Sequence, residues 1–178
     1  MFLGMHSKTA SFFHENIFFK KTRQIQQFFV KGDFKFFLYM MMNSQLVPIN
    51  FNKVMQTRAY TVFVLGNEEK QFAIYTDPHV GLNIQTHITE KNYPRPLTHD
   101  MIDMIFDGFD IKILQIVIDD VQDTVYYARL FIQQQIEDKK QILEIDCRPS
   151  DCLTLALMKN IPIFCKKEVL EKVVPLEE

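Results

Sequence analysis

The sequence predicts an α+β domain in which two β-β-β-α halves form a mixed or antiparallel sheet that packs against helices. Three segments between residues 111 and 147 alternate apolar with polar side chains, as strands with one buried face do. Residues 150–159, which follow them, are apolar nearly all round and indicate a largely buried helix. The stretches that begin at Ile74 and Ile145 share Ile, Pro and Leu at the same spacing. Two similar halves explain this repeat.

The first half begins with a predicted strand over 46–55. Residues 59–77 then predict a hairpin, because two strand-like runs flank Gly66 and Asn67, which are residues typical of turns. This part of the chain therefore supplies three strands.

Two helices are expected next. Residues 77–90 indicate the first, with Asp77 as N-cap and Pro78 at the first helical position. Residues 98–109 indicate the second, which Thr98 caps and which carries acidic residues in its first turn.

The second half is predicted as a meander over 111–119, 125–133 and 141–147, then the buried helix, a short strand over 161–165 and a helix over 167–174. Successive side chains in a strand point to opposite faces, so alternation divides the meander between a helix-facing and an outer set. The helix-facing set is expected to be Leu114, Ile116, Ile118, Ala128, Leu130, Ile132, Leu143, Ile145 and Cys147.

Composition places the chain among globular proteins, with 47% hydrophobic residues and a formal net charge of −2. A diffuse acidic field does not favour a polyanion, so contact with nucleic acid requires a local basic site. Cys147 and Cys152 fall in apolar patterns and are interpreted as small core residues, which fits a reducing, cytoplasmic location. No apolar run approaches the roughly 20 residues of a membrane span.

Residues 1–43 differ from the domain expected at 44–178, because they are rich in Phe, Lys and Gln without a clean period. We interpret them as a poorly ordered N-terminal extension, or as residues translated from an upstream start when the working start is Met40, Met41 or Met42. A basic, Phe-rich segment that contacts a partner or a membrane surface is the alternative. The charged residues of this segment are Lys8, Lys20, Lys21, Arg23, Lys31 and Lys35 against Glu15 and Asp33.

The stretch "EIDCRPSDC" concentrates polar residues between a strand and the buried helix. As structural residues, Ser150 and Asp151 would cap the helix. As a site, Arg148 would grip a phosphate with two parallel hydrogen bonds beside a helix N-terminus, which favours anions. Both interpretations use the same atoms.

Acidic residues nearby suggest a cation. Asp146, with Asp119 or Asp120, would bind Mg²⁺ or Mn²⁺ through carboxylate oxygens, and such an ion would activate water at a phosphoryl centre. The structural alternative is a cross-strand pair: if the second turn centres on residues 137–138, Arg129 lies opposite Asp146.

The stretch "RPLTHD" is a second polar cluster. His99 suits general acid or base chemistry because its free pKa of about 6.5 is near neutrality, and Asp100 would orient it. The structural alternative treats Asp100 as a first-turn acid and His99 as an exposed residue.

In this order and spacing, "RPLTHDMIDMIF", "VIDDVQDTVYYARLFI", "EIDCRPSDCLTLAL" and "IPIF" resemble the bifunctional nuclease family. The resemblance implies a compact α+β domain that self-associates and cuts DNA and RNA. The positions that match the shared motifs are Arg95, Pro96, Thr98, His99, Asp100, Asp119, Asp120, Arg129, Asp146, Arg148, Pro149, Ser150 and Asp151.

The chain departs from the family pattern in two places. His79, Val80 and Gly81 stand where an acidic residue and alanine are usual, and Cys152 stands where a small residue is usual. If the missing acid takes part in the chemistry, activity is expected to be weak.

The leading hypothesis is a nuclease that acts on DNA and RNA with a divalent cation (Mg²⁺ or Mn²⁺), without an organic cofactor, as a homo-oligomer. Its expected residues are His99, Asp100, Asp146, Arg148 and Asp151 for catalysis, Arg95, Arg129 and Ser150 for substrate binding, and Asp119, Asp120 and Asp146 for metal.

The rival hypotheses are a non-catalytic, self-associating binding module and a regulator that binds nucleic acid without cutting it. The acidic net charge and the missing first-half acid favour the non-catalytic binding module. The predicted self-association surface is the outer sheet face, at Ile113, Val117, Tyr127 and Phe131.

Overall fold

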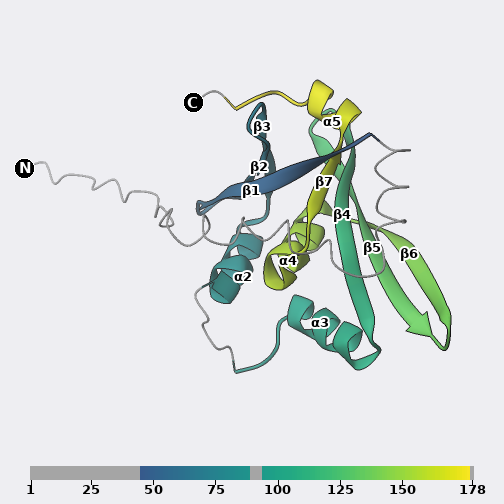
Figure 1. Cartoon of the computed structure of the whole chain (residues 1–178). Coiled ribbons are helices and arrows are strands. Elements are labelled where there is room, and N and C mark those ends of the chain that lie inside the picture. Colours follow the sequence, from purple (N-terminus) through teal and green to yellow (C-terminus); the bar gives the residue numbers. More distant parts are fainter. Residues whose placement is uncertain (1–44, 89–93, 177–178) are drawn as a thin grey trace, which may run out of the picture.

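The computed structural model describes residues 45–88 and 94–176. The N-terminal extension expected at residues 1–43 therefore lies outside the described residues. The described part forms one seven-stranded sheet, of order β3-β2-β1-β7-β4-β5-β6, with helices packed against it (Figure 1). The elements are β1 (Leu46–Gln56), β2 (Thr61–Gly66), β3 (Gln71–Thr76), α2 (Pro78–Ile88), α3 (Thr98–Gly108), β4 (Ile111–Gln122), β5 (Val125–Ile136), β6 (Lys139–Cys147), α4 (Pro149–Lys159), β7 (Ile163–Lys166) and α5 (Lys167–Lys172).

The sheet consists of two antiparallel meanders on either side of β7. β1, β2 and β3 form one meander, and β4, β5 and β6 form the other. β7 lies between them, antiparallel to β1 and parallel to β4. Each meander is followed by a helix, and both helices begin at the proline of the repeated stretch, Pro78 in α2 and Pro149 in α4. The predicted mixed sheet of two β-β-β-α halves is confirmed.

Turns in the meanders depend on residues that accept unusual backbone angles. Gly66 ends β2 with φ of 150°, and a Cβ at this position would lie 2.2 Å from the carbonyl oxygen of Lys70. The side chain of Asn67 then accepts hydrogen bonds from the backbone N–H groups of Glu69 and Lys70. The predicted hairpin turn is confirmed, and glycine is required at its first position.

The second meander is longer than predicted. β4 and β5 continue to Gln122 and Ile136, and their connecting turn and the next one contain Asp123 and Glu137, each with φ of 55°. The second turn falls at residues 137–138, so Arg129 lies opposite Asp146 as expected.

Two register shifts in β4, between Ile113 and Gln115 and between Ile118 and Asp120, interrupt its alternation. Ile113 therefore packs in the helix-facing core, and Leu114 packs against the opposite cluster. We predicted Ile113 on the outer face and Leu114 on the helix-facing side, and both predictions were wrong. Alternation assigns faces correctly only where strand pairing continues without a register shift. Leu143 is 57% exposed, because it lies on the edge strand β6.

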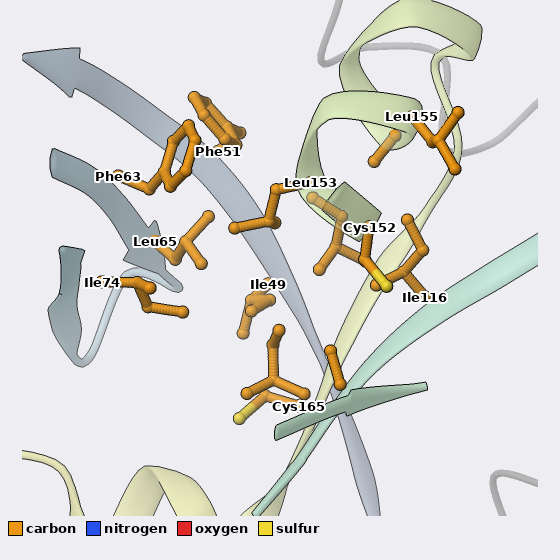
Figure 2. Close-up of a cluster of buried hydrophobic side chains, with 14 of the residues drawn as sticks. Ile49, Phe51, Phe63, Leu65, Ile74, Ile116, Cys152, Leu153, Leu155 and Cys165 are labelled. Carbon is orange, nitrogen blue, oxygen red and sulfur yellow. The ribbon is translucent and has the colours of Figure 1, made fainter. Parts of the chain in front are cut away.

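The main core lies between the sheet and the helices. Cys152, Leu153 and Leu155 of α4 approach Phe63 and Ile116 of the strands (Figure 2). Full burial of side chains of this size contributes about 1.5–3 kcal/mol each. Cys152 is fully buried, which confirms its interpretation as a core residue.

A second apolar cluster comprises Leu46, Val117, Phe131 and Phe164, with Leu114 beside them. Val117 and Phe131 are the predicted outer-face residues, and the register pairs Val117 with both Phe164 and Arg129. We call the sheet surface around this cluster the outer face. No described helix is long and apolar enough to cross a membrane.

Candidate functional site

The first turn of α4 carries the polar residues of the repeated stretch. Arg148, with an extended backbone, occupies the N-cap position and makes no capping hydrogen bond through its side chain. The predicted capping by Ser150 or Asp151 therefore does not match this helix start. Asp151 instead accepts two hydrogen bonds from Arg148, Nε to Oδ2 at 2.7 Å and Nη2 to Oδ1 at 3.2 Å. This pair raises the pKa of the Arg148 guanidinium.

His99 lies in the first turn of α3 and reaches the same carboxylate. Its Nε2 is 3.4 Å from Oδ1 of Asp151, and the residue is only 9% exposed. The sequence-based hypothesis gave Asp100 the role of orienting His99, but the structure places Asp151 beside it. The side chain of Asp151 thus lies between a buried imidazole and an exposed guanidinium.

Asp100 contacts the backbone at the start of α3 and a different histidine, His87. Its Oδ2 accepts a hydrogen bond from the backbone N–H of Leu97 at 2.7 Å, and its Oδ1 lies 3.4 Å from Nε2 of His87. The N-cap of α3 is Leu97, so the predicted cap at Thr98 was wrong by one position. His87, at the end of α2, was not among the predicted site residues.

The side chains of Arg148, Asp151 and His99 form what we call the His99 cluster. It combines two helix starts, whose N–H groups and dipoles favour an anion, with a guanidinium that is 74% exposed. Two of the five N–H donors of Arg148 are used by Asp151, and the others can reach phosphate oxygens. The cluster can therefore hold an anion next to a proton acceptor.

Two predicted substrate-binding residues lie near these helix starts. Arg95 is in the exposed segment that precedes α3. Ser150 is 7% exposed, and its carbonyl accepts a hydrogen bond from the Thr154 hydroxyl at 2.7 Å. Arg95 is thus accessible to a ligand, whereas Ser150 is largely inside the protein.

Arg129 is the centre of a separate cluster on the outer face. Its Nε lies 3.3 Å from Asp119 and 3.8 Å from Asp146, and its Nη1 lies 3.6 Å from Glu144. Lys166 also approaches Asp119, at 3.7 Å. Asp119 is the main cause of the raised pKa of Arg129. Asp146, which is 70% exposed, is therefore paired with Arg129 and belongs to a different cluster from Arg148.

The predicted metal ligands do not assemble in the described residues. Asp119 is shared by Arg129 and Lys166, whereas Asp120 accepts hydrogen bonds from the Gln122 side chain and the Val121 N–H, and lies near Lys172. The hydrogen bond from Gln122 is the main cause of the lowered pKa of Asp120. Across residues 45–88 and 94–176, no three His, Cys, Asp or Glu side chains are placed to hold a metal ion.

A shallow cavity of about 220 Å³ lies elsewhere. Asp110, Lys112, Gln133 and Gln135 line it, beyond the C-terminal end of α3. His99 lies at the opposite end of this helix. The cavity therefore does not belong to the His99 cluster.

The fold and the cluster define an α+β domain of two similar halves, with a histidine, a carboxylate and an arginine at the starts of two helices. The chain belongs to the bifunctional nuclease domain family, whose model matches residues 63–176.

Two uncharacterized proteins, from two strains of Mycobacterium tuberculosis, are each 32% identical to this chain over 77 residues. The aligned stretch covers 43% of this chain and 43% of each relative. The match thus spans less than half the length of these relatives and adds no activity.

Proposed function

We propose that the protein is a nuclease that hydrolyses phosphodiester bonds of DNA and RNA at the His99 cluster. The observation that carries this proposal is the shared carboxylate of Asp151, which contacts His99 on one side and Arg148 on the other. Family membership supports the reaction class, and the cluster supplies groups suited to it.

Each residue has a distinct role in this proposal. Asp151 lies beside Nε2 of His99 and favours the tautomer that carries its proton there, so Nδ1 is left to accept a proton from water. The water oxygen attacks phosphorus, the bond to the leaving oxygen breaks, and that oxygen takes a proton from the imidazolium or from solvent. Arg148 and the α4 N-terminus stabilise the charge that develops on the non-bridging oxygens.

A divalent cation remains part of the proposed activity, because the acidic residues Asp119, Asp120 and Asp146 led us to predict Mg²⁺ or Mn²⁺ from the sequence. The described residues do not form a set of ligands for such an ion, and Asp119 is already paired with the side chains of Arg129 and Lys166. We therefore assign no step of the reaction to a metal. Chelation tests the cation directly.

The second candidate is a module that binds nucleic acid without cutting it. It is favoured by a specific observation: Arg148 is 74% exposed and keeps N–H donors for phosphate oxygens, and such binding requires no proton transfer by His99. Binding without cleavage distinguishes this candidate from a nuclease.

The test uses highly purified full-length protein with single- and double-stranded DNA and RNA, in Mg²⁺, Mn²⁺ or chelator. Arg148→Ala removes the phosphate contact and is expected to lower kcat/KM by about 10²-fold or more. Arg58→Ala, at an exposed arginine between β1 and β2, is the matched control and should cut like wild type. Circular dichroism checks that all variants remain folded.

Asp146→Asn tests the predicted catalytic role of that carboxylate separately. A loss as large as that of Arg148→Ala would support a catalytic role, and retained activity would assign Asp146 to the Arg129 pairs alone. Equal cleavage by wild type and Arg148→Ala would instead indicate a contaminating nuclease and contradict the proposal.

A further inference from the structure

The outer face carries a buried apolar cluster that no described helix contributes to. Leu46, Val117, Phe131 and Phe164 are only 3–6% exposed. All four residues come from strands. The apolar residues of α2, α3, α4 and α5 that pack in a core belong instead to the main core, between the sheet and the helices. Side chains on an open sheet face keep their tips in water unless another layer lies above them.

Two buried glutamines mark the same face. Gln115 pairs with Phe131, and Gln133 lies two residues from Phe131 on β5, so both share its side of the sheet. They are 4% and 6% exposed, yet the Nε2 of Gln115 and the Oε1 of Gln133 lack a hydrogen-bond partner. Buried polar atoms normally have partners. Gln133 lines the cavity beside Asp110 and Lys112, whereas the amide of Gln115 lies outside that lining and points to a covering segment with polar groups to offer.

The chain itself provides a candidate. Leu46, the first residue of β1, belongs to the outer cluster, so the point at which residues 1–44 join the described chain lies next to this face. Gln45 has φ of 46°, a left-handed angle that turns the chain sharply before β1. The segment before it contains more than half of the 17 phenylalanines of the chain and a glutamine-rich run, "QIQQFF".

The charge of residues 1–43 is opposite to that of the carboxylates at the edge of the outer face. Residues 1–43 have an excess of Lys and Arg, whereas Glu144 and Asp146 on β6 are 51% and 70% exposed beside the cluster. Basic residues of the segment can therefore pair with these carboxylates while its phenylalanines meet Phe131 and Val117.

We propose that residues 1–44 pack onto the outer face and cover the cluster of Leu46, Val117, Phe131 and Phe164. The segment acts as a second layer over the sheet, on the side opposite the helices. This inference goes beyond the proposed nuclease activity and does not depend on it.

The test is photo-crosslinking of the full chain. Ile142→p-benzoylphenylalanine places the reactive group on the outer face, because Ile142 lies opposite Gln133 and is 39% exposed. Leu143→p-benzoylphenylalanine is the matched control on the same strand: Leu143 lies opposite Ile132, which faces the helices, and is 57% exposed. Equal amounts of ¹⁴N- and ¹⁵N-labelled protein are mixed before irradiation, and crosslinked peptides are identified by mass spectrometry.

The expected result is a crosslink from position 142 to a peptide within residues 1–44, with both peptides carrying the same isotope, and loss of that crosslink at position 143. Mixed-isotope crosslinks at position 142 would show that a second copy covers the face and would overturn the proposal. Absence of crosslinks to residues 1–44, or equal crosslinks from both positions, would overturn it too.

Discussion

At the residue scale, the carboxylate of Asp151 joins two functions in one side chain. Oδ2 contacts Arg148, which suits a phosphate, and Oδ1 lies close to both Arg148 and His99, which suits proton transfer. Because its partners come from the segment before α4 and from α3, a change at Asp151 should affect substrate binding and turnover together.

Asp151→Asn is expected to lower kcat by roughly 10²-fold, since general acid or base catalysis contributes about 10²–10⁴-fold and depends on an oriented imidazole. KM should change as well, because Arg148 loses the carboxylate that holds its guanidinium in place. Steady-state kinetics on one oligonucleotide measures both. Asp123→Asn, at an exposed turn residue with φ of 55° that asparagine tolerates, is the control. A change in KM alone would contradict the shared role.

The sequence identified His99, Arg148 and Asp151 as candidates but did not pair them correctly. Asp100 follows His99 in the chain and was the natural choice of partner, yet its carboxylate contacts Leu97 and His87. The pairing of His99 with Asp151 depends on how α3 packs beside α4, and local patterns carry no information about that packing. His87 was missed for the same reason.

At the element scale, α2 and α4 begin at equivalent prolines but differ in the residue at the fourth helical position. The N–H of Gly81 in α2 donates to Oγ1 of Thr61 on β2 at 3.2 Å. A Cβ at position 81 would lie 2.5 Å from that oxygen. The equivalent position in α4 is Cys152, which is buried in the main core. Glycine at position 81 therefore permits the contact between α2 and Thr61.

Gly81→Ala is expected to lower the free energy of unfolding by about 1–3 kcal/mol through overpacking, although alanine favours helices. In a Thr61→Ala background, Gly81→Ala should lower the free energy of unfolding by less, because the Thr61 side chain that clashes with the new Cβ is absent. Urea unfolding of the four proteins of this double-mutant cycle measures the coupling. Equal costs in both backgrounds would show that Thr61 does not set the spacing of α2.

The elements themselves were largely predicted, whereas their exact extents and faces were not. Apolar alternation identified β4, β5 and β6, and Asn160, with φ of 56°, ends α4 as expected. The register shifts of β4 were missed, because a bulge adds a residue without a distinctive residue type.

At the scale of the whole molecule, β7 joins two meanders that each end in a helix. The repeat of Ile, Pro and Leu predicted the two halves, but nothing local indicated that the short strand at residues 163–166 would lie in the middle of the sheet. Its position follows from pairing with both β1 and β4, which are distant in the chain. This arrangement leaves α3 beside α4, and so brings His99 to Asp151 (Figure 1).

The central claim is that the His99 cluster performs hydrolysis, and the most direct test is the turnover rate of His99→Gln beside His79→Gln. His79 is an exposed histidine in the first turn of α2, at the position equivalent to Ser150 in α4. We expect kcat of His99→Gln to fall by roughly 10²-fold or more, with the fold intact, while His79→Gln cuts like wild type. Wild-type turnover by folded His99→Gln would contradict the claim.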